Sequence, residues 1–151
     1  MNNEQEISKA EANTRINELK GEVVSHVWRG HGSSLFLELG KLENNSKTNN
    51  PQGEQTVIME WSWRVEETNS IVAGSWSDNN EIDDILVLLK GKTIEDVAYF
   101  GRLSELSIKL SENLWLLSFM TEKGDPEWAI KFRNKEYLKF CNGSFKIEPS
   151  T

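Results

Sequence analysis

The feature that most constrains the fold of this chain is an internal repeat. The run Leu89-Lys90-Gly91 repeats Leu19-Lys20-Gly21 at an offset of 70 residues (19 to 89). Further positions match at this offset, or at an offset of 71 after one inserted residue: Ser8 with Asp78, Glu11 with Glu81, Ile16 with Leu86, Val24 with Ile94, Val27 with Val97, Leu35 with Leu106, Leu37 with Ile108, and Leu39 with Leu110. We therefore expect two copies of one structural unit, pseudo-repeats 8–76 and 78–133.

Each copy is expected to begin with a short helix. Ser8 and Asp78 are each followed three residues later by Glu, the pattern of an N-terminal capping box. Gly21 and Gly91 follow the last apolar positions of the helical pattern, where a left-handed residue commonly ends a helix. The two predicted helices lie within residues 10–20 and from Asp78 to Gly91.

Alternating apolar and polar residues after each helix predict antiparallel strands. The expected strands are 23–28, 35–39, 56–66 and 71–76 in the first copy, and 93–100, 105–110, 115–121 and 128–133 in the second. The spacing from Val24 to Val27 is three rather than two, which indicates a β-bulge. Ala129 aligns with Ala73, which matches the last strand of each copy. Each copy is thus predicted to be a short helix plus a four-stranded antiparallel meander.

Three segments have no counterpart in the other copy. Residues 1–7 are polar and are expected to be frayed. Residues 41–53, rich in Asn, Ser and Lys, are expected to form a mobile loop that the second copy lacks. Asn142-Gly143 is typical of a tight turn, so residues 136–148 are predicted to form a C-terminal hairpin. Packing the two copies around a pseudo-twofold axis gives an α+β fold in which residues 1–151 form a single domain.

The charge of the chain narrows the class of partner. Its 151 residues carry a net charge of −7. This charge argues against nucleic-acid binding and against binding to an anionic membrane surface, because both require basic residues. It is compatible with a basic protein partner, although solubility alone also explains an acidic surface. The six Trp residues supply large side chains that are either buried or used in binding.

No sequence motif indicates catalysis, a cofactor or a metal. The chain lacks phosphate-binding, dinucleotide-binding, zinc-protease and nucleophile-elbow motifs. His26 and His31 are the only histidines, and no third ligand is suggested near them. The acidic run from Asp78 to Asp84 fails the calcium-loop pattern, and helix capping explains it better. We therefore predict no cofactor and no metal, and expect a non-enzymatic protein.

The remaining local signals concern the compartment. Cys141 is the only cysteine, so an internal disulfide is excluded, and its place in an apolar strand predicts a buried, unreactive thiol. The first residues lack the basic and apolar regions of a signal peptide, and no apolar run approaches the roughly 20 residues of a membrane span. These features predict a cytoplasmic protein.

The polar face of the predicted strand 56–66 is the best candidate for a binding site. Val57, Met59, Trp61, Trp63 and Val65 would face the core, which leaves Ile58, Glu60, Ser62, Arg64 and Glu66 on the outer face. We predict that Glu60 and Glu66 contact a basic partner, with Arg64 holding Glu60. A solvated face with a weak ion pair is the competing interpretation.

The overall pattern also resembles a group of known proteins. The pattern consists of the run from Leu19 to Val27, the strand 35–39, the run Glu60-Trp61-Ser62-Trp63-Arg64-Val65, the turn after Gly74 and the second Leu-x-Gly at Leu89-Lys90-Gly91. Together they resemble small uncharacterised bacterial proteins, some linked to the immunity proteins of polymorphic toxin systems. The resemblance implies a bacterial, non-enzymatic protein that binds and blocks another, and it implies no particular site residues.

Three functions remain open at this stage. The leading hypothesis is a protein-binding module, in its sharpest form an acidic immunity protein that neutralises a toxin. The alternative is a small-molecule-binding protein or enzyme that uses a cleft between the two repeats. A homo-oligomer formed through edge strands is the third.

Overall fold

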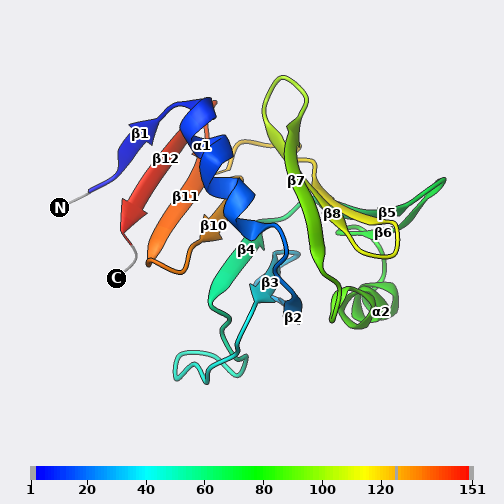
Figure 1. Ribbon diagram of the computed structural model, residues 1–151. Helices are drawn as coiled ribbons and strands as arrows, with labels where there is room; N and C mark the ends of the chain where they lie inside the picture. The colour runs from blue at the N-terminus through cyan, green and yellow to red at the C-terminus, as the bar shows by residue number, and fades with distance from the viewer. Residues whose placement is uncertain (1–2, 125, 150–151) are drawn as a thin grey trace.

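The computed structural model describes residues 3–124 and 126–149 and has an α+β fold (Figure 1). Its helices are α1 (Lys9–Ile16), the short 3-10 helix η1 (Asn17–Leu19) and α2 (Asn79–Leu89). Twelve antiparallel strands form two sheets, one of seven strands and one of five. The strands are β1 (Gln5–Ile7), β2 (Val24–Arg29), β3 (Leu35–Leu39), β4 (Gln55–Met59), β5 (Trp63–Glu67), β6 (Ser70–Gly74), β7 (Ile94–Phe100), β8 (Glu105–Leu110), β9 (Leu114–Ser118), β10 (Trp128–Lys131), β11 (Glu136–Cys141) and β12 (Ser144–Pro149).

The helix ends follow the sequence signals. The Ser8 side chain accepts a hydrogen bond from the backbone N–H of Glu11, and the Asp78 side chain accepts one from Glu81. These bonds satisfy amides that have no partner inside the first turn. Gly21 and Gly91 have φ angles of +87° and +91°, which an L side chain rarely adopts. Both predicted helices and their capping residues are confirmed.

The strand order differs from two separate meanders. The seven-stranded sheet has the order β1-β12-β11-β10-β4-β3-β2, and the five-stranded sheet has the order β6-β5-β9-β8-β7. Strands β2 to β4 thus share a sheet with β10 to β12 from the second half of the chain, joined through the pair of β4 with β10. Strands β7 to β9 share a sheet with β5 and β6 from the first half, joined through the pair of β9 with β5. The prediction of a four-stranded meander within each copy is wrong, because each half places three strands in one sheet and then crosses to the other. Strand β10 lies inside its sheet between β11 and β4, whereas β6 is an edge strand of the other sheet, so the alignment of Ala129 with Ala73 is also wrong.

The predicted strand 56–66 is in fact two strands in different sheets. Strand β4 ends at Met59, and β5 begins at Trp63. The alternation hid the break because Val57, Met59, Trp63 and Val65 are all buried, so the pattern continues across the crossover. Trp61, predicted to be in the core, is only half-buried. Residues of the crossover form backbone hydrogen bonds with the second half of the chain. For example, the carbonyl oxygen of Ser62 accepts a hydrogen bond from the amide of Phe119.

The two halves meet at the segments that follow the helices. The backbone N–H of Gly21 donates to the carbonyl oxygen of Ile94 at 2.8 Å, and the N–H of Gly91 donates to that of Val24 at 2.7 Å. An isolated antiparallel bridge joins Val23 and Thr93 between these bonds. The junction therefore links β2 and β7, the two edge strands that would otherwise leave their backbone groups unpaired.

The core lies between the two sheets and the helices. The helix α1 packs against β7, and α2 packs against β2 and β6 (Figure 1). The residues expected at buried, equivalent places are all at most 1% exposed: Leu19, Leu89, Val24, Ile94, Leu37 and Ile108. Bulges interrupt β2 and β7 just after Val24 and Ile94, as the three-residue apolar spacing predicted.

The first and last strands, β1 and β12, are paired at one edge of the seven-stranded sheet. Residues 5–7, expected to be frayed, form β1 and pair with β12, so that part of the prediction is wrong. The C-terminal hairpin is confirmed, with Asn142 and Gly143 at φ angles of +52° and +77° in its turn. Glu4 forms ion pairs with Lys139 of β11 and Lys146 of β12, which hold the polar N-terminal segment against these strands.

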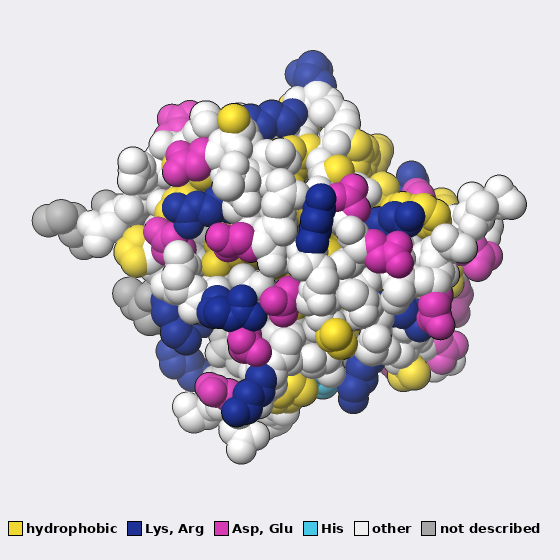
Figure 2. Space-filling view, in the orientation of Figure 1, with side chains coloured by type: hydrophobic (Ala, Val, Ile, Leu, Met, Phe, Trp, Pro, Cys, Tyr) yellow, Lys and Arg dark blue, Asp and Glu magenta, His cyan; other side chains and the backbone are white. Residues whose placement is uncertain are grey.

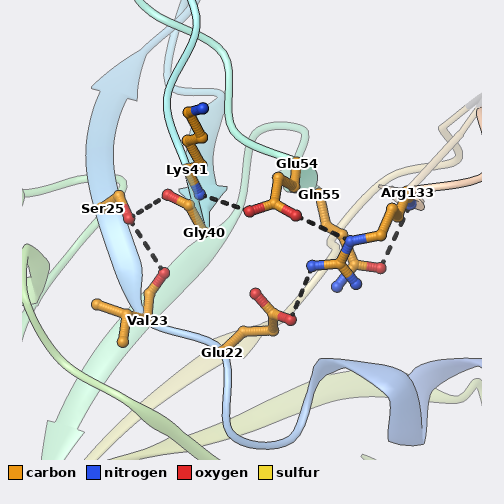
Figure 3. Close-up of polar contacts among 8 residues, drawn as sticks. All are labelled: Glu22, Val23, Ser25, Gly40, Lys41, Glu54, Gln55 and Arg133. Carbon is orange, nitrogen blue, oxygen red and sulfur yellow. Dashed lines mark hydrogen bonds and ion pairs between the residues drawn. The ribbon is translucent and has the colours of Figure 1, made fainter.

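Residues 41–53, which we call the covering loop, are held by hydrogen bonds. Glu43 and Gln52 exchange two backbone bonds of 2.8 Å inside the loop. At its base, the Glu54 carboxylate accepts from the N–H of Lys41 and from Arg133, which also bonds to Glu22 (Figure 3). Figure 1 shows the loop leaving β3 and returning to β4 at the lower end of the seven-stranded sheet.

Candidate functional site

The three predicted site residues lie at the five-stranded sheet and the crossover that leads into it. Arg64 and Glu66 are on the outer face of β5, and Glu60 lies in the crossover between β4 and β5. Arg64 forms its ion pair with Glu66, with Nε 2.7 Å from Oε2, and not with Glu60. The expectation that Arg64 holds Glu60 is therefore wrong, because the chain changes sheets between the two residues.

An exposed apolar cluster surrounds Arg64. Ile71, Trp76 and Phe119, which we call the aromatic patch, are 59%, 89% and 51% exposed. All three line one shallow depression of about 370 Å³ together with Arg64, whose guanidinium carbon is 5.9 Å from the centre of the Phe119 ring. A second depression of about 290 Å³ lies between Trp76 and Trp61 and has Glu122 on its wall. Large apolar side chains gathered in this way are typical of interaction surfaces.

The apolar surface continues from the patch along β9. Trp115 and Leu117 alternate with buried residues and are half-buried on the same outer face as Phe119. Lys109 lies with its ammonium nitrogen 5.8 Å from the centre of the Trp115 ring. The register places Glu66 opposite Trp115. Aromatic rings flanked by paired charges thus form a continuous surface across β5, β9 and β8.

Charges of both signs accompany the apolar residues. The ion pairs of this sheet join Arg64 to Glu66 and Lys109 to Glu95. Figure 2 shows acidic and basic side chains interspersed over the face that it presents, without a broad area of one sign. On the face that Figure 2 presents, the charges are therefore mixed rather than gathered in one stripe.

Two carboxyl groups near the crossover have raised pKa values. Burial raises the pKa of Glu60, and burial together with the nearby Glu105 raises the pKa of Glu127. The backbone joins these two residues, because the N–H of Glu60 points to the carbonyl oxygen of Glu127 at 3.4 Å. A raised pKa is a common property of catalytic acids, but acid catalysis also needs a cleft and a second group in reach. Glu127 lines a shallow depression of about 240 Å³ with Glu105, apart from the aromatic patch, and Glu60 lines neither this depression nor the two beside Trp76.

Local structure accounts for the other residues that the sequence singled out. His26 is hydrogen-bonded through Nε2 to the side-chain oxygen of Asn50 at 2.8 Å. Cys141 is buried at the end of β11. Asp78 caps α2, which accounts for the acidic run that begins there. No group of three or more His, Cys, Asp or Glu side chains suited to a metal ion occurs in the described part of the chain.

The sequence reasoning missed the aromatic patch. Trp76 follows β6 in a turn of small polar residues, and its indole is 89% exposed, whereas Trp63 and Trp128 inside strands are buried and Trp28 and Trp115 are half-buried. A Trp flanked by Ser75 and Ser77 just after a short strand was the available signal. Phe119 was assigned to a strand interior, whereas β9 ends one residue before it.

Comparisons of the chain with protein-family models, with curated proteins and with solved structures give no match. Among the described residues, neither helix has the length and apolar character needed to cross a lipid bilayer.

Proposed function

We propose that this chain is a non-enzymatic protein-binding module that docks through the outer face of its five-stranded sheet. The observation that carries the proposal is the exposure of Trp76, at 89%, between two depressions. Leaving an indole in water forgoes a burial free energy of a few kcal/mol. A binding partner that covers Trp76 recovers it.

The surroundings of Trp76 suit a protein partner. Trp and Arg are the residues most enriched among the few that carry most of the binding energy of an interface. Arg64 lies beside the aromatic patch with its charge paired to Glu66, so the guanidinium is already positioned before a partner arrives. Positioned groups lose less conformational entropy on binding.

More specifically, we propose that the module is an acidic immunity protein that neutralises a toxin. The net charge of −7 and the resemblance to immunity proteins of polymorphic toxin systems support a basic partner. Glu122 lines one depression, and Glu66 is paired with Arg64, which lines the other. Acidic side chains at such places can speed association with a basic protein. Glu60, Arg64 and Glu66 remain the proposed partner-binding residues.

We further propose that the two halves are copies of one unit that exchange their last strands. Two hydrogen bonds support a revised alignment: Trp63 donates its indole N–H to the carbonyl oxygen of Ser33, and Trp128 donates to that of Ser104. Each Trp begins the strand that crosses to the other sheet, and each Ser lies between the first two strands of its half. The offsets are 65 residues for the Trp pair (63 to 128) and 71 for the Ser pair (33 to 104).

The binding proposal is tested by a comparison of three proteins as bait in a pull-down from the source cell. We expect wild type to retain a basic protein at low salt, and Trp76→Ala to lose it. The matched control is Val87→Ala, because Val87 is also exposed, at 76%, but lies on α2 outside the patch. Retention by Trp76→Ala equal to that of wild type would sink the proposal.

A further inference from the structure

A cavity of about 190 Å³ lies on the outer face of the seven-stranded sheet, beneath the covering loop. Its floor is formed by two neighbouring rows of side chains, which the strand register defines. One row runs from Glu38 through Thr56 and Lys131 to Tyr137, across β3, β4, β10 and β11. The next row contributes Trp28, Phe36 and Ile58. The cavity therefore spans the seam between β4 and β10, where the two halves of the chain meet.

Glu38 brings a buried negative charge to this cavity. Its side chain lines the cavity although the residue is only 3% exposed. The carboxylate accepts from Trp28 Nε1 at 2.7 Å, from Thr56 Oγ1 at 2.6 Å and from the N–H of Gly53 at 3.0 Å. A carboxylate offers about four acceptor positions, so one remains. All three donors are neutral, and the buried charge has no countercharge in them.

Lys131 brings a positive charge to the same cavity. None of the ion pairs formed by the described residues includes Glu38 or Lys131. Burial and the neighbouring Lys135 lower the pKa of Lys131, and Glu38 opposes this lowering. One strand separates Glu38 from Lys131, so their Cα atoms are about 10 Å apart. The two opposite charges thus face one cavity without meeting.

The remaining walls are apolar or carry neutral polar groups. The rings of Trp28 and Phe36 are stacked, with centroids 4.0 Å apart. Asn45, Thr48 and Gln52 of the covering loop close the cavity from above. The base of the loop packs closely against β3, so that a Cβ on Gly53 would lie 2.5 Å from the backbone of Leu39. Glycine at this position allows the close approach that brings its N–H to Glu38.

We propose that this cavity binds an apolar amino acid as a zwitterion, with its ammonium group at Glu38, its carboxylate at Lys131 and its side chain against the Trp28–Phe36 stack. The two charges of a zwitterion are separated by a single carbon atom, so one small molecule bridges a gap that the two side chains leave open. The buried Glu38 and the half-buried Lys131 then each gain a countercharge, and charge-assisted hydrogen bonds of this kind are the strong ones. The size of the cavity, below the usual range for drug-sized ligands, also fits a single amino acid. This inference is independent of the protein-binding face, which lies on the other sheet.

The test measures ligand binding by calorimetry and by the shift in melting temperature of the full chain. The probes are L-leucine, L-methionine and L-phenylalanine, with phenethylamine and phenylpropanoate as analogues that each lack one charge. We expect at least one of the three amino acids to raise the melting temperature by about 3 °C at roughly ten times its Kd. The two analogues of L-phenylalanine are expected to bind at least about tenfold more weakly than the parent amino acid.

The decisive variant is Lys131→Met, which keeps the length of the side chain and removes the charge. We expect it to keep the fold, because Lys131 takes part in none of the ion pairs among the described residues, and to weaken amino-acid binding about tenfold or more. Lys90→Met is the matched control, since Lys90 is exposed beyond the end of α2 and outside the cavity. The proposal is overturned if none of the three amino acids binds, if Lys131→Met binds as tightly as wild type, or if phenethylamine binds as tightly as L-phenylalanine.

Discussion

The indole N–H of Trp63 donates to the backbone carbonyl oxygen of Ser33 at 2.7 Å. Trp63 begins β5 in the five-stranded sheet, and Ser33 lies in the turn between β2 and β3 of the seven-stranded sheet. This bond therefore fixes the point where the chain crosses from one sheet to the other. Trp128 makes the corresponding bond to Ser104 at 3.1 Å, at the crossover in the opposite direction.

Replacing either Trp by Phe is expected to destabilise the protein. Trp63→Phe and Trp128→Phe each leave a carbonyl oxygen without its donor and remove part of a buried ring, because both Trp residues are at most 2% exposed. We expect a loss of about 1–3 kcal/mol in the free energy of unfolding for each, measured by urea denaturation. Trp115→Phe, on the half-buried outer face, is the control and is expected to change stability by less than about 0.5 kcal/mol. Equal effects of all three would contradict a special role for the crossover bonds.

The sequence predicted local structure well because each local feature has a nearby cause. Ser8 and Asp78 bond to amides three residues away, and the Asn142-Gly143 turn joins strands that are adjacent in sequence. The break at residues 60–62 could not be seen, because the apolar alternation carries no information about which sheet a strand joins. The crossover depends on contacts with β9 and β10, more than 50 residues away along the chain.

The candidate site was predicted only in part, for the same reason. The alternation of β5 placed Arg64 and Glu66 on an outer face, and both are there. The depression beside them needs Phe119 and Trp76, which come together only when β5 pairs with both β9 and β6. Likewise, no sequence spacing relates Glu38 to Lys131, because the register of β3, β4 and β10 alone brings them to one cavity.

The proposed equivalence of the two halves predicts matched effects at Gly21 and Gly91. Their φ angles differ by only a few degrees, and a Cβ at either would meet no atom within 4 Å. The cost of an Ala substitution is therefore backbone strain alone, about 1 kcal/mol at each position. Gly21→Asn and Gly91→Asn should cost less, because Asn tolerates positive φ. Denaturant midpoints of the four variants measure this, and a cost at one position without the other would count against the equivalence.

The docking of β1 is expected to depend on pH through Glu4. Hydrogen bonds from Lys146 and Lys139 lower the pKa of Glu4 below its ordinary value of 4.5. A lowered pKa means stability that is present above the ordinary value and is lost as the pH falls through the lower, folded-state value. Glu4→Gln should therefore cost about 0.5–1 kcal/mol at neutral pH and nothing in strong acid. Unfolding curves at neutral and acid pH would show this, and a cost that does not vary with pH would refute it.

The last prediction separates partner binding from stability at the predicted site residues. Burial raises the pKa of Glu60, so ionised Glu60 reduces stability increasingly as the pH rises through that raised value. Glu60→Gln removes this cost, while Glu66→Gln removes the partly exposed ion pair with Arg64, which is worth little. The double variant is therefore expected to stay within about 0.5 kcal/mol of wild type at neutral pH.

Association with a basic partner should respond much more strongly than stability does. We expect the double variant to associate about two- to tenfold more slowly at low salt, and its rate to depend less on salt, because rim charges act mainly on the association rate. Glu18→Gln with Glu43→Gln gives the same change in net charge on residues exposed elsewhere, on η1 and the covering loop. Stopped-flow association with the captured partner, measured over a range of salt concentrations, distinguishes the two double variants. Equal rates for both would show that only the net charge matters, and that Glu60 and Glu66 do not contact the partner.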